Sequence, residues 1–200
     1  ALNSLRRIFC EFLESGRLTI TKESGSKKDK QDDEKKSKLR EYKVWLKKQF
    51  TDFQDTLCGF VSGRDEETIT PAIRTMIEFT RREWMITRGQ EDKDGGTAAV
   101  MTKKAHFGVE CFTSLMRALC YSDKDVEVEI LLMMRSEVFD KTDCRFFAWL
   151  VLRKLLVEAK VRGKPEGATA SSMTPEAVAS VVQNGLDLLR ILSYEDQEVI

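Results

Sequence analysis

Residues 42 to 50 read Tyr42-Lys43-Val44-Trp45-Leu46-Lys47-Lys48-Gln49-Phe50. Apolar side chains recur here at steps of three and four residues, which places them on one side of an α-helix. The same spacing continues to Phe53, so the pattern predicts a long amphipathic helix from about Lys38 to Val61, which Gly63 can end. We expect Trp45 and Phe53 to anchor this helix in a core.

Helical spacing recurs on both sides of this segment. The alternation at residues 126–130 is too short to indicate a strand, and it runs on into a helical apolar pattern as far as Met134. The sequence therefore predicts an all-α protein. Six further helices are expected to carry the apolar residues of Leu2–Leu13, Ile69–Trp84, Val109–Leu119, Val126–Val138, Phe146–Leu155 and Val178–Leu192.

Single residues mark where several of these helices begin and end. Gly16 can stop the first helix, and Gly89 the third. Pro71 is tolerable only near the first turn of its helix. Asp143 is placed to cap the sixth helix, because its carboxylate can accept hydrogen bonds from free backbone N–H groups. Thr174-Pro175-Glu176 offers an N-cap, a proline at the first helical position and an acid in the first turn.

Polar segments separate the helices. Residues 21–38 lose nearly all apolar side chains and mix charges of both signs, so we expect a charged mobile loop that cannot offset its ordering entropy. Residues 90–104 include Gly95-Gly96 and are expected to form a connector, and residues 163–172 a further loop. The whole of residues 1–200 is expected to form a single helical-repeat domain that belongs to a longer chain.

The succession of helices predicts an architecture. Helices of this length joined by short or charged connectors are typical of HEAT or armadillo-like stacked helical hairpins, in which helix pairs recur at about 40 residues. A compact helical bundle uses the same elements and is the alternative. In either case stacked helices make the core.

The amino-acid composition limits the classes of partner that we expect this chain to bind. Lys plus Arg and Asp plus Glu both number 33, so no long-range field favours nucleic acid or an anionic membrane. The five cysteines are odd in number and contain no Cys-x-x-Cys pair, which indicates buried free thiols in a reducing compartment. The longest apolar runs fall far short of the ~20 residues that span a bilayer. We therefore expect no membrane partner.

No group of residues predicts catalysis. His106 is the only histidine, and Cys111 lies five residues on, poorly aligned on a helix for a base and its nucleophile. One histidine without a cysteine pair does not predict a zinc site. Gly95-Gly96 lacks the preceding strand and the following lysine of a phosphate-binding loop. We expect no enzyme activity, no cofactor, no metal and no small-molecule substrate.

Basic residues are the candidates for binding. Smaller basic clusters lie near helix C-terminal ends, within residues 81–88 and 153–162. A longer stripe, opposite the face of Trp45 and Phe53, forms if the second helix reaches back far enough. Each group is either a solvated face that complements the helix dipole or a contact for RNA phosphate or an acidic partner segment. The stripe consists of Lys36, Arg40, Lys43 and Lys47.

Four ordered segments carry a resemblance to a known family. They are the opening helix that ends in Phe12-Leu13-Glu14-Ser15-Gly16, then Tyr42-Lys43-Val44-Trp45-Leu46 after a charged insertion, the helix Ile73–Phe79, and Phe139–Phe147. In the last segment the family has an aromatic, an acidic pair, an arginine and an aromatic pair. Lys141 and Thr142 depart from that pattern, and the residues that fit it are Phe139, Asp140, Asp143, Arg145, Phe146 and Phe147.

In this order and spacing the segments resemble the N-terminal helical half of the nucleolar complex protein four family, ribosome-assembly factors related to CCAAT-binding-factor-like proteins. The resemblance implies a non-enzymatic scaffold in small ribosomal subunit biogenesis and pre-ribosomal RNA processing. Such a scaffold acts by protein–protein interaction within the small-subunit processome, in the nucleolus and nucleus. The implied partners are nucleolar protein fourteen and other processome proteins, with pre-ribosomal RNA contacted indirectly or weakly.

Two alternatives come from other classes. A general helical-repeat adaptor outside the nucleolus has every compositional feature of this chain. An RNA-binding module would use the basic stripe, although the zero net charge and the lack of an exposed-looking aromatic platform argue against strong binding by the domain alone.

Overall fold

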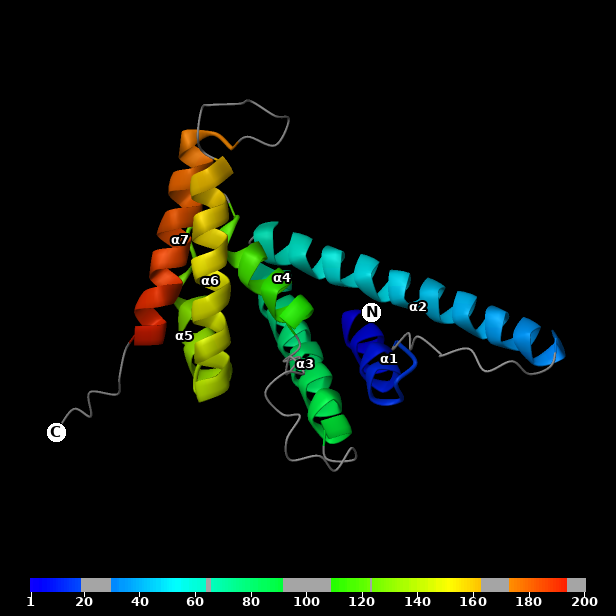
Figure 1. Cartoon of the computed structure of the whole chain (residues 1–200). Helices are drawn as coiled ribbons and strands as arrows, with labels where there is room; N and C mark the ends of the chain where they lie inside the picture. Colours follow the sequence, from blue (N-terminus) through cyan, green and yellow to red (C-terminus); the bar gives the residue numbers. More distant parts are fainter. Residues whose placement is uncertain (19–29, 64–65, 92–108, 123, 163–172, 194–200) are drawn as a thin grey trace. The chain divides into compact units, whose positions relative to one another are not determined.

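The structure is a computed structural model that describes residues 1–18, 30–63, 66–91, 109–122, 124–162 and 173–193 (Figure 1). Within these residues every regular element is a helix and no strand occurs, which confirms the all-α prediction. Packed helix pairs suit both a stacked-hairpin repeat and a bundle. The helices are α1 (Leu2–Glu14), α2 (Lys30–Gly63), α3 (Glu66–Glu91), α4 (Val109–Cys120), α5 (Val128–Glu137), α6 (Thr142–Arg162) and α7 (Pro175–Ser193).

Helix α2 begins at Lys30, several residues before the start at about Lys38 that its apolar pattern predicted. Residues 30–38 are helical, so this part of the expected mobile loop at 21–38 was wrong. Lys, Glu and Gln are strong helix formers, and a helix that already packs through its later turns extends through them without apolar side chains. Residues 21–29 lie outside the described residues. The connector expected at 90–104 begins later too, because Gln90 and Glu91 end α3, and its remainder lies outside the described residues.

The boundary residues give mixed results. Thr174 is the N-cap of α7 as predicted, since its Oγ1 accepts a hydrogen bond from the Ala177 N–H at 3.2 Å. Gly16 follows α1 with φ of 67°, the left-handed conformation that ends helices. Asp143 is not a cap, because α6 already begins at Thr142. Pro71 lies in the second turn of α3, since that helix starts at Glu66 rather than near Ile69.

The described chain falls into two compact units. The first comprises residues 1–57 and 74–111, and the second residues 58–73 and 112–200. Helices α2 and α3 each contribute residues to both units. The single domain expected over residues 1–200 stays a prediction.

An aromatic cluster forms the core of the first unit. The ring of Phe9 from α1 lies 5.3 Å from that of Phe50 and 5.3 Å from that of Phe53, both on α2. Phe50 in turn contacts Phe79 of α3 at 5.1 Å between ring centroids. Aromatic pairs at these separations add to the burial free energy of each ring. Phe53 is thus half-buried in the core, as predicted for an anchor.

Trp45 does not anchor α2. Its side chain is 55% exposed, whereas Leu46 and Phe50 are buried. Consecutive residues of a helix point about 100° apart, so a core that takes Leu46 and Phe50 turns Trp45 toward solvent. The apolar spacing alone was compatible with either register.

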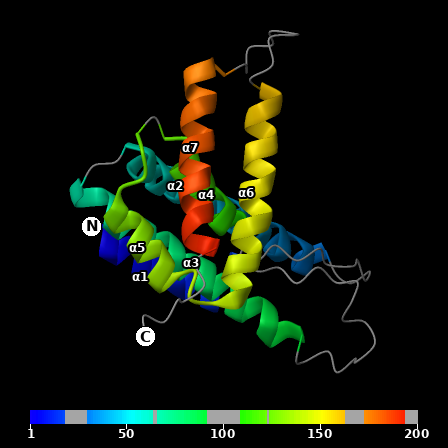
Figure 2. The same ribbon diagram turned by 90° about the vertical axis from the view of Figure 1, so that its left-hand side faces the viewer.

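The second unit is built around a pair of long helices. Helices α6 and α7 pack against each other, and α5 packs on α7 (Figure 2). Gly185 permits the close approach of the first pair, because a Cβ at this position would lie 2.9 Å from Leu156 Cδ2. The buried core of this unit includes Leu119, Met134, Leu152, Leu155 and Leu188.

Candidate partner-binding surface

The predicted basic stripe lies on the first unit. Arg40 and Lys47 are exposed on α2 and Lys43 is half-buried. Lys36 is within the helix, but its side chain is not among those described. The helical register extends back past Lys36, so the condition for one continuous stripe is met. Nothing in the structure tests what the stripe binds.

An exposed aromatic pair lies on the same helix. Tyr42 and Trp45 are 45% and 55% exposed, and their ring centroids are 6.0 Å apart. The sequence was expected to lack an exposed aromatic platform, and this expectation was wrong. The reason is again the register of α2, which buries Leu46 and Phe50 and leaves Tyr42 and Trp45 exposed.

Glu83 of α3 is the carboxylate with the most altered pKa in the described chain. Its pKa is raised from 4.5 to about 7, mainly by burial and further by the negative charge of Glu110, while the positive charge of Lys47 opposes both effects. Lys47, the last residue of the basic stripe, therefore interacts electrostatically with Glu83 in the first unit. Perturbed carboxyl groups occur at catalytic sites, and the charged groups that act on this one are Glu110 and Lys47.

Only part of the thiol and metal chemistry considered from the sequence falls on described residues. Cys111 is fully buried, and its Sγ donates a hydrogen bond to the Met76 carbonyl at 3.4 Å. His106, its proposed neighbour, lies outside the described residues. The described side chains contain no group of three or more His, Cys, Asp or Glu placed to hold a metal ion. All five cysteines are free thiols, of which Cys111 and Cys120 are buried and the other three are partly exposed.

The segment that resembled the family motif closes the turn between α5 and α6. Phe139 is buried, and the Nε of Arg145 donates a hydrogen bond to its carbonyl oxygen. Asp140 and Lys141 form an exposed ion pair with an O···N distance of 3.2 Å. Phe146 and Phe147 contact each other edge to face at 5.7 Å. The aromatic and arginine positions of this motif therefore have structural roles at the start of α6.

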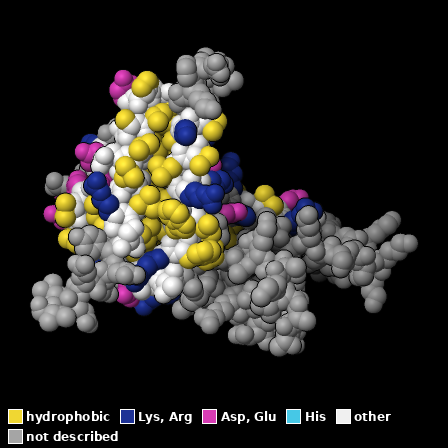
Figure 3. Space-filling view, turned by 60° about the vertical axis from the view of Figure 1, so that its left-hand side comes forward, with side chains coloured by type: hydrophobic (Ala, Val, Ile, Leu, Met, Phe, Trp, Pro, Cys, Tyr) yellow, Lys and Arg dark blue, Asp and Glu magenta, His cyan; other side chains and the backbone are white. Residues whose placement is uncertain are grey.

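The outer face of α6 carries several of the apolar side chains that are exposed in the described part of the second unit. Trp149 is 52% exposed and Val161 is 62% exposed, whereas the apolar side chains of the core are almost fully buried. Steps of three and four residues place these side chains along one line of the helix. Figure 3 shows hydrophobic side chains gathered over this part of the unit. The outer face of α6 consists of Phe146, Trp149, Leu150, Arg153, Val157, Lys160 and Val161.

The opposite side of α6 is also apolar. Ala148, Leu152 and Leu155 are fully buried there against the rest of the unit. A helix that is hydrophobic all round is normally covered on every side. The outer face of α6 is therefore the side of this helix that lacks its cover within the described chain.

The charged side chains on the outer face of α6 are positive, and the one nearby acid lies on its flank. Arg153 and Lys160 lie on the face, and Lys154 lies at its edge. The one acid between residues 146 and 161 is Glu158, which points to the flank and pairs with Arg117 of α4 at 3.2 Å. Lys154 reaches the same carboxylate at 4.0 Å. Among the described residues, Arg153 has no ion-pair partner.

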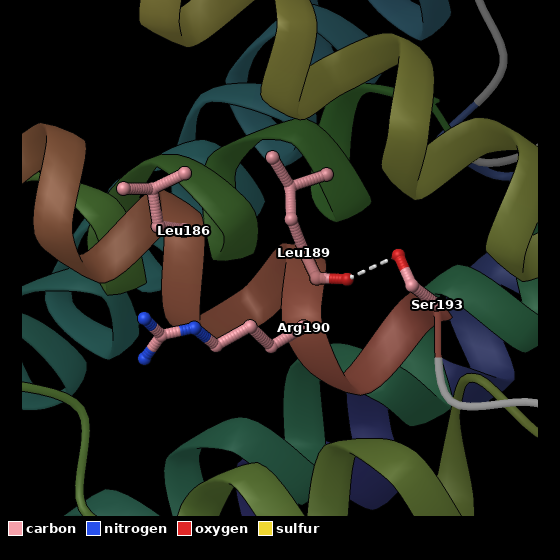
Figure 4. A pocket seen from close by; sticks show the side chains of 4 residues that line it. All are labelled: Leu186, Leu189, Arg190 and Ser193. Carbon is pink, nitrogen blue, oxygen red and sulfur yellow. Dashed lines mark hydrogen bonds between the residues drawn. The ribbon is translucent and has the colours of Figure 1, made fainter.

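Helix α7 carries a shallow pocket near its C-terminal end (Figure 4). It has a volume of about 430 Å³ and is lined by Leu186, Leu189, Arg190 and Ser193. Its polar groups are already engaged, because Ser193 Oγ donates to the Leu189 carbonyl at 3.0 Å and Arg190 pairs with Asp187 at 2.9 Å. Among its described lining residues, the pocket therefore offers apolar side chains from Leu186 and Leu189 and polar side chains that are already paired.

The sequence placed the apolar residues of α6 and the basic residues at 153–162, but it did not show that they share an exposed face. The sequence did contain one signal, because α6 is apolar on all sides. A single core covers only one side of a helix, so the other side had to remain exposed or bind a partner. Along the described part of the chain, every helix is either too short or too polar to traverse a lipid bilayer. Comparison with protein-family models, with curated proteins and with solved structures found no match to this chain.

Proposed function

We propose that this protein is a non-enzymatic scaffold that binds another protein through the outer face of α6. The observation that carries the proposal is the line of exposed apolar side chains from Phe146 to Val161 on a helix whose other side is already packed. Contiguous exposed apolar patches mark interaction sites. Tryptophan, here Trp149, is among the residue types that most often dominate the binding energy of an interface.

The proposed setting is small ribosomal subunit biogenesis and pre-ribosomal RNA processing in the nucleolus. Here the partners would be nucleolar protein fourteen and other proteins of the small-subunit processome. This setting is supported by the resemblance of four ordered sequence segments to the nucleolar complex protein four family. A general helical adaptor would use the same face with other partners in another compartment.

The test is affinity purification of the tagged protein from nuclear extract, with identification of the proteins and RNA that accompany it. Trp149→Ser removes the largest apolar side chain of the outer face of α6, and Trp45→Ser is the matched control, because Trp45 is exposed to nearly the same extent on another helix. We expect processome proteins and small-subunit precursor RNA with the unaltered protein and with Trp45→Ser, and their loss with Trp149→Ser. An unchanged set with Trp149→Ser would refute the role of this face, and partners unrelated to ribosomes would refute the setting.

RNA binding is a second candidate that one observation favours. The exposed Tyr42 and Trp45 rings lie on the helix that carries the basic stripe, and bases stack on such rings beside cationic side chains. Binding of single-stranded RNA to the isolated protein should then weaken steeply with salt and weaken again in Trp45→Ser. Absence of salt-dependent binding would remove this candidate.

A further inference from the structure

We infer that the partner segment on the outer face of α6 is an acidic amphipathic helix, with a carboxylate near its middle that pairs with Arg153. The inference rests on the proposed function, since it names the partner of the same face. Its carrying observation is the Arg153 guanidinium at the centre of an apolar line, with Lys154 and Lys160 beside it and the one nearby acid, Glu158, already paired with Arg117.

The shape of the face fits a helix. The exposed apolar residues run from Phe146 to Val161, a span of about 23 Å at ~1.5 Å per residue. A partner helix of about four turns covers this length. Amphipathic helices bind such surfaces through apolar side chains at the same three- and four-residue spacing.

The positive charge of the outer face of α6 favours an acidic partner. Arg153 lies between Leu150 and Val157 along the same line, so a partner that covers those residues also removes Arg153 from water. Covering a guanidinium without a counter-ion is costly, and a carboxylate that meets it in a bidentate pair offsets that cost. Lys154 and Lys160 extend the positive charge to the edges. A partner with basic flanks is excluded by the same charges.

A second copy of this chain is a poor occupant. Arg153 stands midway between Phe146 and Val161, so a two-fold axis that pairs two α6 helices in antiparallel fashion brings the two guanidinium groups together. The one acid in this stretch, Glu158, is already paired with Arg117 on the flank. A homodimer through this face therefore places like charges at its centre.

A lipid surface is disfavoured by the same residue. Helices that lie in a membrane interface keep their cations on the polar side and bury an unbroken apolar side. Arg153 instead occupies the side that would enter the lipid. A protein partner can supply a fixed carboxylate at that point, and an acyl chain cannot.

The experiment is a charge exchange between the whole 200-residue protein and a synthetic peptide. The probe is a labelled 16-residue helix with leucines on one face, one glutamate in the middle of that face and glutamates at its edges. Its binding is measured by fluorescence anisotropy. We expect Arg153→Glu to weaken this binding at least tenfold, and a peptide with arginine in place of the central glutamate to bind Arg153→Glu more tightly than the unaltered protein. Arg7→Glu, an equal charge change at an exposed site on α1, should alter binding less than twofold.

Folding is controlled by circular dichroism, and Arg153→Gln replaces Arg153→Glu if the latter has lost its helical signal. Equal binding of the acidic peptide to the unaltered protein and to the Arg153 variant overturns the inference. So does sedimentation of the unaltered protein, but not of Trp149→Ser, with phosphatidylserine vesicles, or a dimer in sedimentation velocity that Trp149→Ser dissolves. If the charge exchange fails while Trp149→Ser still loses its partners from extract, the inference falls and the proposed function stands. If Trp149→Ser loses nothing, both fall.

Discussion

Asn184 of α7 accepts a hydrogen bond at its Oδ1 from the backbone N–H of Val126, at 3.1 Å. The Nδ2 of the same side chain lies 3.2 Å from the carbonyl oxygens of Cys120, Ser122 and Lys124 and donates to them. Asn184 is fully buried. One carboxamide thus pairs with four backbone groups of the segment that leads from α4 toward α5.

Replacement of Asn184 should therefore be costly. We expect Asn184→Leu to lower the free energy of unfolding by about 3 kcal/mol, because it leaves several buried backbone groups without partners. Gln183→Ala at the exposed neighbouring position is the matched control and should cost less than about 0.5 kcal/mol. Urea denaturation of both variants measures the difference, and equal midpoints would contradict the role of Asn184.

Gly185 and Gly59 form a matched pair of helical glycines. No atom lies within 4 Å of a Cβ added at Gly59, so Gly59→Ala should stabilise the protein by roughly 0.5–1 kcal/mol through helix propensity. At Gly185 the same methyl group displaces Leu156, and we expect that displacement to cancel the gain. Thermal denaturation should raise the melting temperature of Gly59→Ala only. A comparable rise in Gly185→Ala would show that α6 and α7 are not closely packed at this point.

The register of α2 is tested by two aromatic residues. Phe50 is 5% exposed and contacts Phe9 and Phe79, so Phe50→Ala should cost about 3–5 kcal/mol through cavity formation. Trp45 faces solvent, so Trp45→Ala should cost less than about 1 kcal/mol. Denaturant unfolding of the two variants checks this order. A larger loss in Trp45→Ala would reverse the register described for α2.

The raised pKa of Glu83 predicts that the stability of the folded protein depends on pH. Its pKa in the folded protein is raised to about 7 from an ordinary 4.5, so between these values the folded state holds a proton that the unfolded state has released. Stability therefore falls as pH rises from about 4.5 to about 7 and stays lower above that range. We expect Glu83→Gln to be more stable than the unaltered protein by about 2 kcal/mol at pH 8 and to lose most of this slope.

The neighbouring acid supplies the control for this slope. Glu110 raises the pKa of Glu83, so Glu110→Gln should move the fall in stability to lower pH without abolishing it. Unfolding free energies from pH 4 to pH 9 separate the three proteins. Parallel curves for all of them would contradict the assignment to Glu83.

Periodicity and capping chemistry in the sequence were sufficient to predict the all-α class and the start of α7. Both depend on neighbours along one helix, such as Thr174 and Ala177. The start of α2 was missed because residues 30–38 are held by helix propensity and by continuity with a packed helix, and apolar spacing reports neither.

The candidate site depended on contacts that the sequence does not display. Trp45 and Leu46 are adjacent, and only the packing of Phe50 against Phe9 decides which of the two faces solvent. In α6 both sides are apolar, so no periodicity could show that Trp149 would remain exposed. Asn184 was not singled out either, since its partners lie about sixty residues away.

The Asn184-Gly185 pair also governs how the chain ages. Asparagine followed by glycine is chemically the pair most prone to deamidation, because the glycine amide nitrogen can attack the side-chain carbonyl. In the folded protein this nitrogen is held within α7, and the carboxamide is fixed among backbone carbonyls. Each unfolding episode releases both groups. The aspartate that forms would bring a negative charge against three carbonyl oxygens, so a chain that deamidates while unfolded loses its route back to the native turn.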